Sequence, residues 1–172
     1  MELPLRTADE LIDAHTETRR AARRSGSWAW MLRDLWRLSL EREGPIPVDE
    51  VHRLLPGRTR EAVAEALDAL DADDLIVVRD GQLTAAYPFS GEATAFAVIL
   101  PDGRQRYACC AIDALGIAPM LGQPIEVDSP CHHCGEPLAF AVDVGGPAAG
   151  AAGIMVWVSQ WDGAGGRRAT SL

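Results

Sequence analysis

The chain has 172 residues, a formal net charge of −9 and 48% hydrophobic residues. This length suits one good-sized domain or two small ones, and the apolar fraction is sufficient for a buried core. The negative charge argues against attraction of the whole protein to nucleic acid or to an anionic membrane.

The start of the sequence lacks the pattern of a secretory signal, and no apolar run approaches the roughly 18 residues that a membrane span needs. We therefore expect a cytoplasmic protein with no membrane partner. In that compartment the 4 cysteines are typical of metal binding or catalysis rather than of disulfide bonds.

Two helices are expected near the start of the chain. Residues 7–24 begin with Thr7 and carry Glu10 three positions later, which is the spacing of a capping box. Residues 27–43 form the stronger pattern, because their apolar side chains recur with a period near 3.6. The tryptophans of this second segment share the helical spacing and indicate packing surface rather than a ligand cage: Trp28, Trp30 and Trp36.

The next segment has a winged-helix pattern of helix, turn, helix and hairpin. Helices are expected over 48–55 and 59–71, followed by strands over 74–79 and 82–86. The dipeptide Asp80-Gly81 lies between the two strands and is a strong signal for a tight hairpin turn.

A winged helix often binds DNA, but the second helix of this one is net acidic. Its charged residues, with those of the preceding turn, are Arg58, Arg60, Glu61, Glu65, Asp68 and Asp71. Such a surface is a poor partner for phosphates. The sequence therefore disfavours DNA as a partner and favours a winged-helix shape used for packing or as a dimer surface.

The second half has the pattern of a sheet with one packed helix. Residues 87–90, YPFS, are expected to be a linker, and the small-residue run 145–153 is expected to be a loop. Strands are expected over 94–100, 105–109, 124–128, 138–144 and 154–159. The sequence thus predicts an α+β fold. Residues 1–88 would form a helical, winged-helix-like domain, and residues 89–172 a domain with a small mixed or antiparallel sheet and a packed helix.

The segment 107–121, YACCAIDALGIAPML, places two adjacent cysteines and a carboxylate at the start of a short apolar helix. On a helix, Cys110 lies three positions and Cys109 four positions before Asp113, so spacing alone allows either thiol on the face of the carboxylate. Free backbone N–H groups in a first helical turn lower a thiol pKa, whereas a neighbouring carboxylate raises it unless it accepts the thiol proton.

Two interpretations of this cluster are open. A thiolate is a ligand for soft metals, and an adjacent carboxylic acid can deliver a proton to whatever the sulfur holds. Alternatively, both cysteines are small core residues of an apolar helix, because free cysteine is often buried.

The segment 131–137, CHHCGEP, contains a C-x-x-C pair, Cys131 and Cys134, with two histidines between them. One such pair is half of a zinc-ribbon site, and a complete site needs a second pair. Cys109 and Cys110 are adjacent, which is not a usual chelating arrangement. Either these thiolates bind a metal such as zinc, or the knuckle is a structural turn with exposed histidines.

The stretch 107–138, YACCAIDALGIAPMLGQPIEVDSPCHHCGEPL, resembles the signature region of the alkylmercury (organomercurial) lyases. The matching pattern is Y-A-x-C-A-I-D-A-L-G-I, then a strand, then S-P-C-x-x-C-G-E-P. The upstream helix-turn-helix-hairpin and YPFS also resemble that family's N-terminal part. The resemblance covers roughly residues 45–160.

The resemblance implies cleavage of carbon–mercury bonds by protonolysis, in the service of mercury resistance. In that reaction one cysteine binds the mercury, a second cysteine joins it, and an aspartate protonates the carbon. By motif position the first cysteine is Cys110 and the aspartate is Asp113, while Cys131 matches a cysteine regarded as structural. No cofactor is required, because mercury belongs to the substrate and the product. The implied partners are a small organomercurial and small thiols.

The sequence departs from the family at the second catalytic cysteine, which in the family lies downstream of the strand that matches IMVWVS. No cysteine follows Cys134 here. The chain is then a truncated member, or Cys109, Cys131 or Cys134 substitutes, or the fold persists without mercury chemistry. Two alternatives accompany the lyase. One is a non-catalytic thiolate protein for Hg²⁺, Zn²⁺ or Cu⁺ that uses Cys110 and the C-x-x-C pair. The other is a metal-sensing winged-helix regulator.

Overall fold

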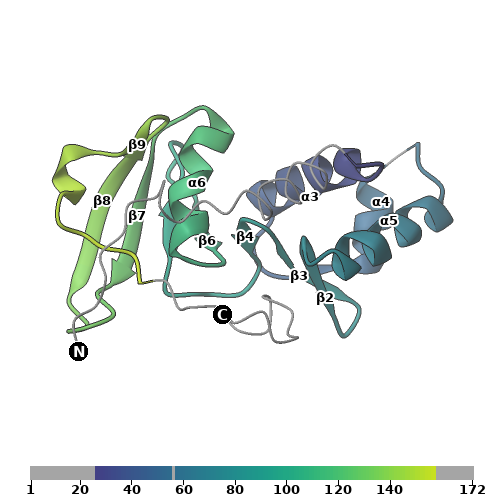
Figure 1. The fold of residues 1–172 in the computed structure, drawn as a ribbon. Helices are drawn as coiled ribbons and strands as arrows, with labels where there is room; N and C mark the ends of the chain where they lie inside the picture. The colour runs from purple at the N-terminus through teal and green to yellow at the C-terminus, as the bar shows by residue number, and fades with distance from the viewer. Residues whose placement is uncertain (1–25, 56, 158–172) are drawn as a thin grey trace.

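The computed structural model describes residues 26–55 and 57–157. In this part of the chain a nine-stranded antiparallel sheet is accompanied by four α-helices, which confirms the expected α+β class (Figure 1). The helices are α3 (Ala29–Glu41), α4 (Val48–Leu54), α5 (Arg60–Ala72) and α6 (Ala111–Leu121). The helix expected over 7–24 lies outside the described residues.

The sheet runs through the whole described chain in the order β1-β3-β4-β6-β5-β7-β8-β9, with β2 also paired to β3. Its strands are β1 (Ile46–Pro47), β2 (Ile76–Arg79), β3 (Gln82–Ala86), β4 (Phe89–Ser90), β5 (Ala97–Ile99), β6 (Gln105–Ala108), β7 (Ile125–Pro130), β8 (Pro137–Asp143) and β9 (Gly146–Pro147). Figure 1 shows two groups of elements side by side, with α3, α4 and α5 at one end and α6 at the other.

The first hydrophobic core lies between α3, α4, α5 and strands β1 to β3. The helices bury the apolar stripe that their 3.6-residue period predicts: Met31, Leu32, Leu35 and Leu38 from α3, and Val63, Ala66, Leu67 and Leu70 from α5. Oγ1 of Thr59 caps α5 by accepting a hydrogen bond from the backbone N of Ala62 at 3.2 Å. The three tryptophans of the α3 segment pack against this core, as predicted.

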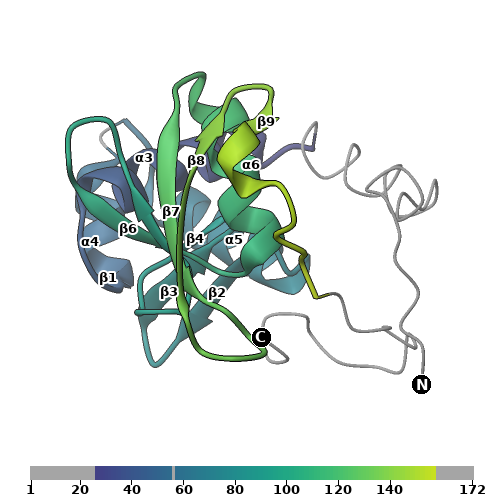
Figure 2. The ribbon, with the colours of Figure 1, turned by 90° about the vertical axis from the view of Figure 1, so that its left-hand side faces the viewer.

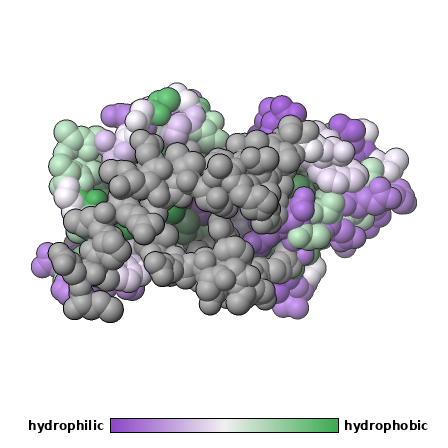
Figure 3. All heavy atoms as spheres, in the orientation of Figure 1, coloured by the Kyte–Doolittle hydropathy of each residue, from purple (hydrophilic) through white to green (hydrophobic). Residues whose placement is uncertain are grey.

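The hairpin between β2 and β3 is confirmed at the expected turn. Asp80 and Gly81 both have positive φ, of 51° and 74°, which is the backbone that a two-residue turn of this kind requires. The predicted order of helix, turn, helix and hairpin is therefore present in α4, α5, β2 and β3. Figure 3 shows hydrophilic side chains over this end of the molecule.

The expected linker at 87–90 is wrong. Phe89 and Ser90 form β4, which pairs with β3 on one side and with β6 on the other, so a single sheet passes through both halves. Pro88 and Gly91 gave the segment a turn-like composition, and a two-residue strand is decided by distant pairing partners rather than by local propensity. Separate cores lie on either side of β4, and the division into 1–88 and 89–172 stays a prediction.

The second core lies between α6 and one face of the strands from β5 to β8. Burial alternates along β7, where Ile125 and Val127 face the core while Glu126 and Asp128 are exposed. The helix α6 ends at Gly122, whose φ of 66° is the left-handed conformation typical of a helix end. Figure 2 shows α6 on one face of β7 and β8.

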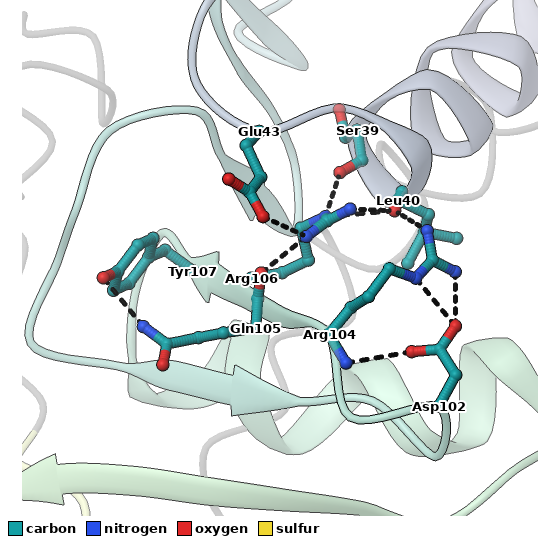
Figure 4. A network of polar contacts seen from close by, with 8 residues as sticks. All are labelled: Ser39, Leu40, Glu43, Asp102, Arg104, Gln105, Arg106 and Tyr107. Atoms are coloured by element: carbon teal, nitrogen blue, oxygen red, sulfur yellow. Dashed lines mark hydrogen bonds and ion pairs between the residues drawn. The ribbon is translucent and has the colours of Figure 1, made fainter.

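Two arginines join the end of α3 to the second half of the sheet (Figure 4). Arg106 on β6 is only 5% exposed, and its guanidinium donates to the carbonyl oxygens of Ser39 and Leu40. Nη1 of Arg104 donates to the same Leu40 oxygen at 2.8 Å. The last carbonyls of a helix have no partner within the helix, so these arginines satisfy them and fix α3 against β6.

The end of the described chain differs from the expected loop and strand. The small-residue run contains β9 and a short 3-10 helix, η1 (Ala149–Ala151). Residues 154–157 form no strand, and 158–159 lie outside the described part. The apolar side chains of 154–157 follow the face that carries α6, where they line a cavity instead of pairing in the sheet. Over residues 26–55 and 57–157, no helix is long and apolar enough to cross a membrane.

Candidate functional site

The two adjacent cysteines lie in an extended corner between β6 and α6. The strand ends at Ala108 and the helix starts at Ala111, with Cys110 as its N-cap at φ −151° and ψ 176°. The backbone N of Cys109 donates to the carbonyl of Pro88 at 3.0 Å, which anchors the corner to β4. Because both cysteines precede the first residue of α6, the helical spacing of three or four positions does not decide which thiol meets the carboxylate.

Cys110 is the thiol that contacts Asp113. Its Sγ donates to Oδ2 of Asp113 at 3.1 Å, and the same sulfur accepts a hydrogen bond from the backbone N of Asp113 at 3.4 Å. Both side chains are half-buried. The sulfur thus occupies the place that a serine or aspartate oxygen usually takes at a helix N-cap. The proton of the thiol points at the carboxylate that could receive it.

The pKa of the Cys110 thiol is raised to about 11, so the lowering expected of a first helical turn does not prevail. Burial is the largest cause, and the negative charge of Asp113 is the second. Hydrogen bonds from the backbone of Asp113 and Ile112 act in the opposite direction without compensating. At neutral pH the resting site therefore holds a thiol, and a base must remove its proton before the sulfur binds a metal.

Two further acidic groups surround this pair. Burial raises the pKa of the Cys109 thiol above its ordinary value, and the charges of Asp113 and Cys110 add to the effect. Burial also raises the pKa of Tyr87, followed by the charges of Cys109, Asp74 and Asp113. Tyr87 therefore stays a neutral phenol beside the cysteines. Sequence reasoning missed it, and its only signal was its place in the YPFS segment.

The knuckle around Cys131 and Cys134 forms a tight turn at the end of β7. The backbone N of Cys131 donates to the carbonyl of Glu136 at 2.7 Å, and the backbone N of Gly135 donates to the carbonyl of Cys131 at 2.8 Å. Hydrogen bonds from the backbone of Cys134 and His133, and then from the Cys134 thiol, lower the pKa of the Cys131 thiol. The two histidines are exposed. The surroundings of Cys131 thus favour its thiolate, whereas those of Cys109 and Cys110 disfavour theirs.

A cavity of about 490 Å³ lies between α6, the sheet and residues 154–157. The apolar part of its wall includes Ala111, Ala114, Val127, Phe140, Met155 and Trp157. Cys131 and His132 lie on the same wall, and the ring of His132 stacks on Trp157 with 6.5 Å between centroids. Ala111 and Ala114 are the direct neighbours of Cys110 and Asp113 along α6, so the cavity adjoins the candidate site.

The structure brings Cys110 and Asp113 into contact but does not gather all four cysteines. Within residues 26–55 and 57–157, no three His, Cys, Asp or Glu side chains form a group that could hold a metal ion. The four cysteines are all free thiols. Zinc binding by these thiolates therefore stays a prediction of the sequence.

Comparisons with known proteins agree with the motif of this site. The family model described as alkylmercury lyase matches residues 89–172. The alkylmercury lyase of Staphylococcus epidermidis (strain ATCC 12228 / FDA PCI 1200) is 29% identical over 121 residues, which cover 68% of this chain and 51% of that protein. The alkylmercury lyase of Streptomyces lividans is 30% identical over 122 residues, which cover 69% of this chain and 53% of that protein.

A solved structure supports the same relationship. The crystal structure of the mercury-bound form of MerB2 matches with a TM-score of 0.50 at 25% identity, covering 60% of this chain and 50% of that one. This chain thus spans about half the length of the relatives it matches. The sequence relatives and the solved structure point to the same assignment, and the chain belongs to the alkylmercury lyase family.

Proposed function

We propose that this protein cleaves the carbon–mercury bond of organomercurials by protonolysis, with Cys110 as the mercury ligand and Asp113 as the proton carrier. The observation that carries the proposal is the 3.1 Å contact from Sγ of Cys110 to Oδ2 of Asp113. A pure metal-binding site has no need of a carboxylate that shares a proton with its thiol.

The first step is capture of the substrate. The carboxylate of Asp113 removes the proton of the Cys110 thiol, the sulfur binds the mercury of R–Hg–SR′, and R′S⁻ leaves. The base is necessary because the pKa of Cys110 is about 11. Asp113 is then a carboxylic acid beside the bound mercury, which prepares it for the second step.

The second step is protonolysis. A second thiolate binds the mercury and increases the electron density on the carbon, and the carboxylic acid of Asp113 delivers its proton to that carbon. The products are R–H and Hg²⁺ held by two thiolates, and Asp113 is again a carboxylate. We assign the second thiolate to Cys109 or to an external small thiol. Nε1 of Trp36 donates to the backbone carbonyl of Tyr87 at 2.6 Å, and this contact would hold the segment beside the corner in place.

The test is arene release from an arylmercurial in excess small thiol. We expect release from the unaltered chain and its loss in Cys110→Ser and Asp113→Asn. Asp143→Asn is the matched control, because Asp143 is an exposed carboxylate on β8 and the same change there should leave release intact. Cys109→Ala decides the second thiolate: if Cys109 supplies it, release becomes dependent on the concentration of external thiol.

The competing function is non-catalytic binding of a soft metal by thiolates. It is favoured by the knuckle, where hydrogen bonds that do not involve Asp113 lower the pKa of the Cys131 thiol and so stabilise its thiolate. Stoichiometric mercury binding with no arene release would establish it and reject the lyase.

DNA is not part of the proposal, because the acids of α5 are exposed: Glu61, Glu65 and Asp68. The four free thiols fit the cytoplasm, which we propose as the location.

A further inference from the structure

We propose that Cys131 and Cys134, the knuckle pair, are a reversible dithiol–disulfide couple that exchanges with small-molecule disulfides, and that closing the disulfide alters the wall of the adjoining cavity through His132. The couple is additional to the proposed cleavage of organomercurials and uses none of the residues assigned to that reaction. It follows from the geometry of the turn that joins β7 to β8.

The first observation is the backbone of this turn. Cys131 closes the hairpin of β7 and β8, because its backbone N donates to the carbonyl of Glu136 at 2.7 Å. Its own carbonyl accepts a hydrogen bond from the backbone N of Gly135 at 2.8 Å, which makes a single helical turn. Side chains three positions apart on such a turn share one face, with about 5–6 Å between their Cβ atoms. The side chains of Cys131 and Cys134 are therefore neighbours.

The second observation is the contact between the two thiols. The thiol of Cys134 hydrogen-bonds to Cys131, and both cysteines are free. The Cβ atoms of a disulfide lie roughly 3.5–4.5 Å apart. Closing the bond therefore requires a movement of about 1–2 Å within the turn. The turn has room for this movement, because residues 132–135 are all exposed.

The chain contains a second pair of cysteines that lacks this geometry. Cys109 and Cys110 are adjacent, and the Cα atoms of adjacent residues are about 3.8 Å apart. This distance is shorter than the roughly 4.4 Å at which the usual range for disulfides begins. Both of these cysteines are half-buried, whereas Cys134 is exposed to reagents in solution. Oxidation by exchange should therefore be confined to the knuckle pair.

The exchange starts at Cys134, the exposed thiol. Its sulfur loses its proton and attacks a small disulfide R′S–SR′, which forms a mixed disulfide on Cys134 and releases R′S⁻. The sulfur of Cys131, deprotonated in turn, attacks the Cys134 sulfur, closes the protein disulfide and releases a second R′S⁻. The two thiol protons go to the two leaving groups, which become R′SH. Two electrons pass from the cysteines to the small disulfide, and excess R′SH reverses the reaction.

His132 transmits the change in the turn to the cavity. It lies between the two cysteines in the chain, and its ring stacks on Trp157 with 6.5 Å between centroids and 19° between planes. Both residues line the 490 Å³ cavity. Aromatic pairs interact at centroid distances up to roughly 7 Å, so a movement of about 1–2 Å is large enough to disrupt this stack. We therefore expect the fluorescence of Trp157 to differ between the reduced and the oxidised chain.

The experiment equilibrates the full chain with mixtures of a small thiol and its disulfide, from reducing to oxidising. Remaining thiols are alkylated, and proteolysis after acidic residues separates the two cysteine pairs, since Asp113 and Glu126 lie between them. We expect the peptide with the knuckle pair to lose two hydrogens as the proportion of disulfide rises and to regain them when thiol is restored. Cys109 and Cys110 should remain available for alkylation throughout.

Two serine variants test the order of attack. Cys131→Ser leaves no thiol to displace the mixed disulfide, so the chain should accumulate one R′S group on Cys134. In Cys134→Ser the half-buried Cys131 should take up R′S more slowly, and faster uptake there would reject Cys134 as the point of entry. Circular dichroism of each variant checks that the fold is present.

Fluorescence tests the link to the cavity. The difference in emission between the reduced and the oxidised chain should disappear in His132→Ala, which keeps both thiols and Trp157. His133→Ala is the matched control and should keep the difference, because His133 is an exposed neighbour that does not line the cavity in the described part of the chain. Unchanged emission on oxidation of the unaltered chain would reject the link.

The couple is overturned if the knuckle pair stays reduced at every ratio of thiol to disulfide, or if restored thiol does not reopen the bond. A metal ion that stays on the knuckle pair and blocks the exchange would equally overturn it and assign the turn to metal binding. Arene release is measured separately. Its presence or absence decides the lyase function and leaves the result for the knuckle pair unchanged.

Discussion

Alkylation of Cys110 by iodoacetamide should be slow at neutral pH and should accelerate well beyond pH 9. Its pKa is about 11 against an ordinary 9.0, and only the thiolate reacts. At pH 7 roughly one thiol in 10,000 is ionised, against one in 100 for an unperturbed thiol. A thiolate of higher pKa is a stronger nucleophile, by roughly six- to tenfold over this interval. The net expectation is a rate about tenfold below that of a free cysteine.

Asp113→Asn separates the two roles of the carboxylate. The substitution removes the negative charge and keeps the burial, so it lowers the pKa of Cys110 by part of the shift and speeds alkylation at pH 7 roughly severalfold. Arene release should be lost in the same variant, because an amide has no acidic proton to deliver. Opposite effects on the two reactions are the signature of a carboxylate that both suppresses the thiolate and supplies the proton.

Site-resolved mass spectrometry between pH 6 and pH 11 measures these rates in one sample. Cys131 serves as the internal comparison, because its pKa is lowered and its alkylation should level off at lower pH. The reasoning is refuted if Cys110 and Cys131 share one midpoint, or if Asp113→Asn slows the alkylation of Cys110.

Three further predictions concern stability. Arg106→Met should lower the free energy of unfolding by about 2–4 kcal/mol, because the Ser39 carbonyl loses the guanidinium that it contacts. Arg104→Met is its control and should cost less than about 1 kcal/mol, since Arg104 is exposed. Urea denaturation measures both losses, and a larger loss for Arg104→Met than for Arg106→Met would contradict the roles that the contacts in Figure 4 give the two side chains. Gly81→Ala should cost about 1 kcal/mol in the same assay because φ is 74° there, whereas Gly145→Ala, with open space around the new carbon, should be neutral. Finally, the pKa values of Cys110, Cys109 and Tyr87 are all raised in the folded protein. Their contribution to stability is therefore complete below the pKa of the unfolded chain and is lost as pH rises through the pKa of the folded protein. The melting temperature should fall above about pH 9, and it should fall less steeply in Cys109→Ala.

The elements that the sequence predicted are those whose signals are local. The apolar period of 27–43 identified α3, and Asp80-Gly81 fixed the hairpin, because a 3.6-residue stripe and a positive-φ turn depend on neighbouring residues alone. The signature around Cys110 and Asp113 likewise indicated the family before any geometry was known. A motif of given residue types at fixed spacing can be recognised in the sequence even when the fold around it is not known.

The features that only the tertiary structure decided depend on residues far apart in the chain. The β4 strand exists because β3 and β6 supply its partners. Cys110 rather than Cys109 meets Asp113 because the corner beneath them is extended and anchored to Pro88. The pKa of the Cys110 thiol rises because burial, a property of the packed site, outweighs the hydrogen bonds from the backbone at the start of α6. The cavity beside Cys131 arises where α6, the sheet and residues 154–157 enclose a common space. Long-range pairing and burial are set by the whole fold, and no local stretch of sequence encodes them.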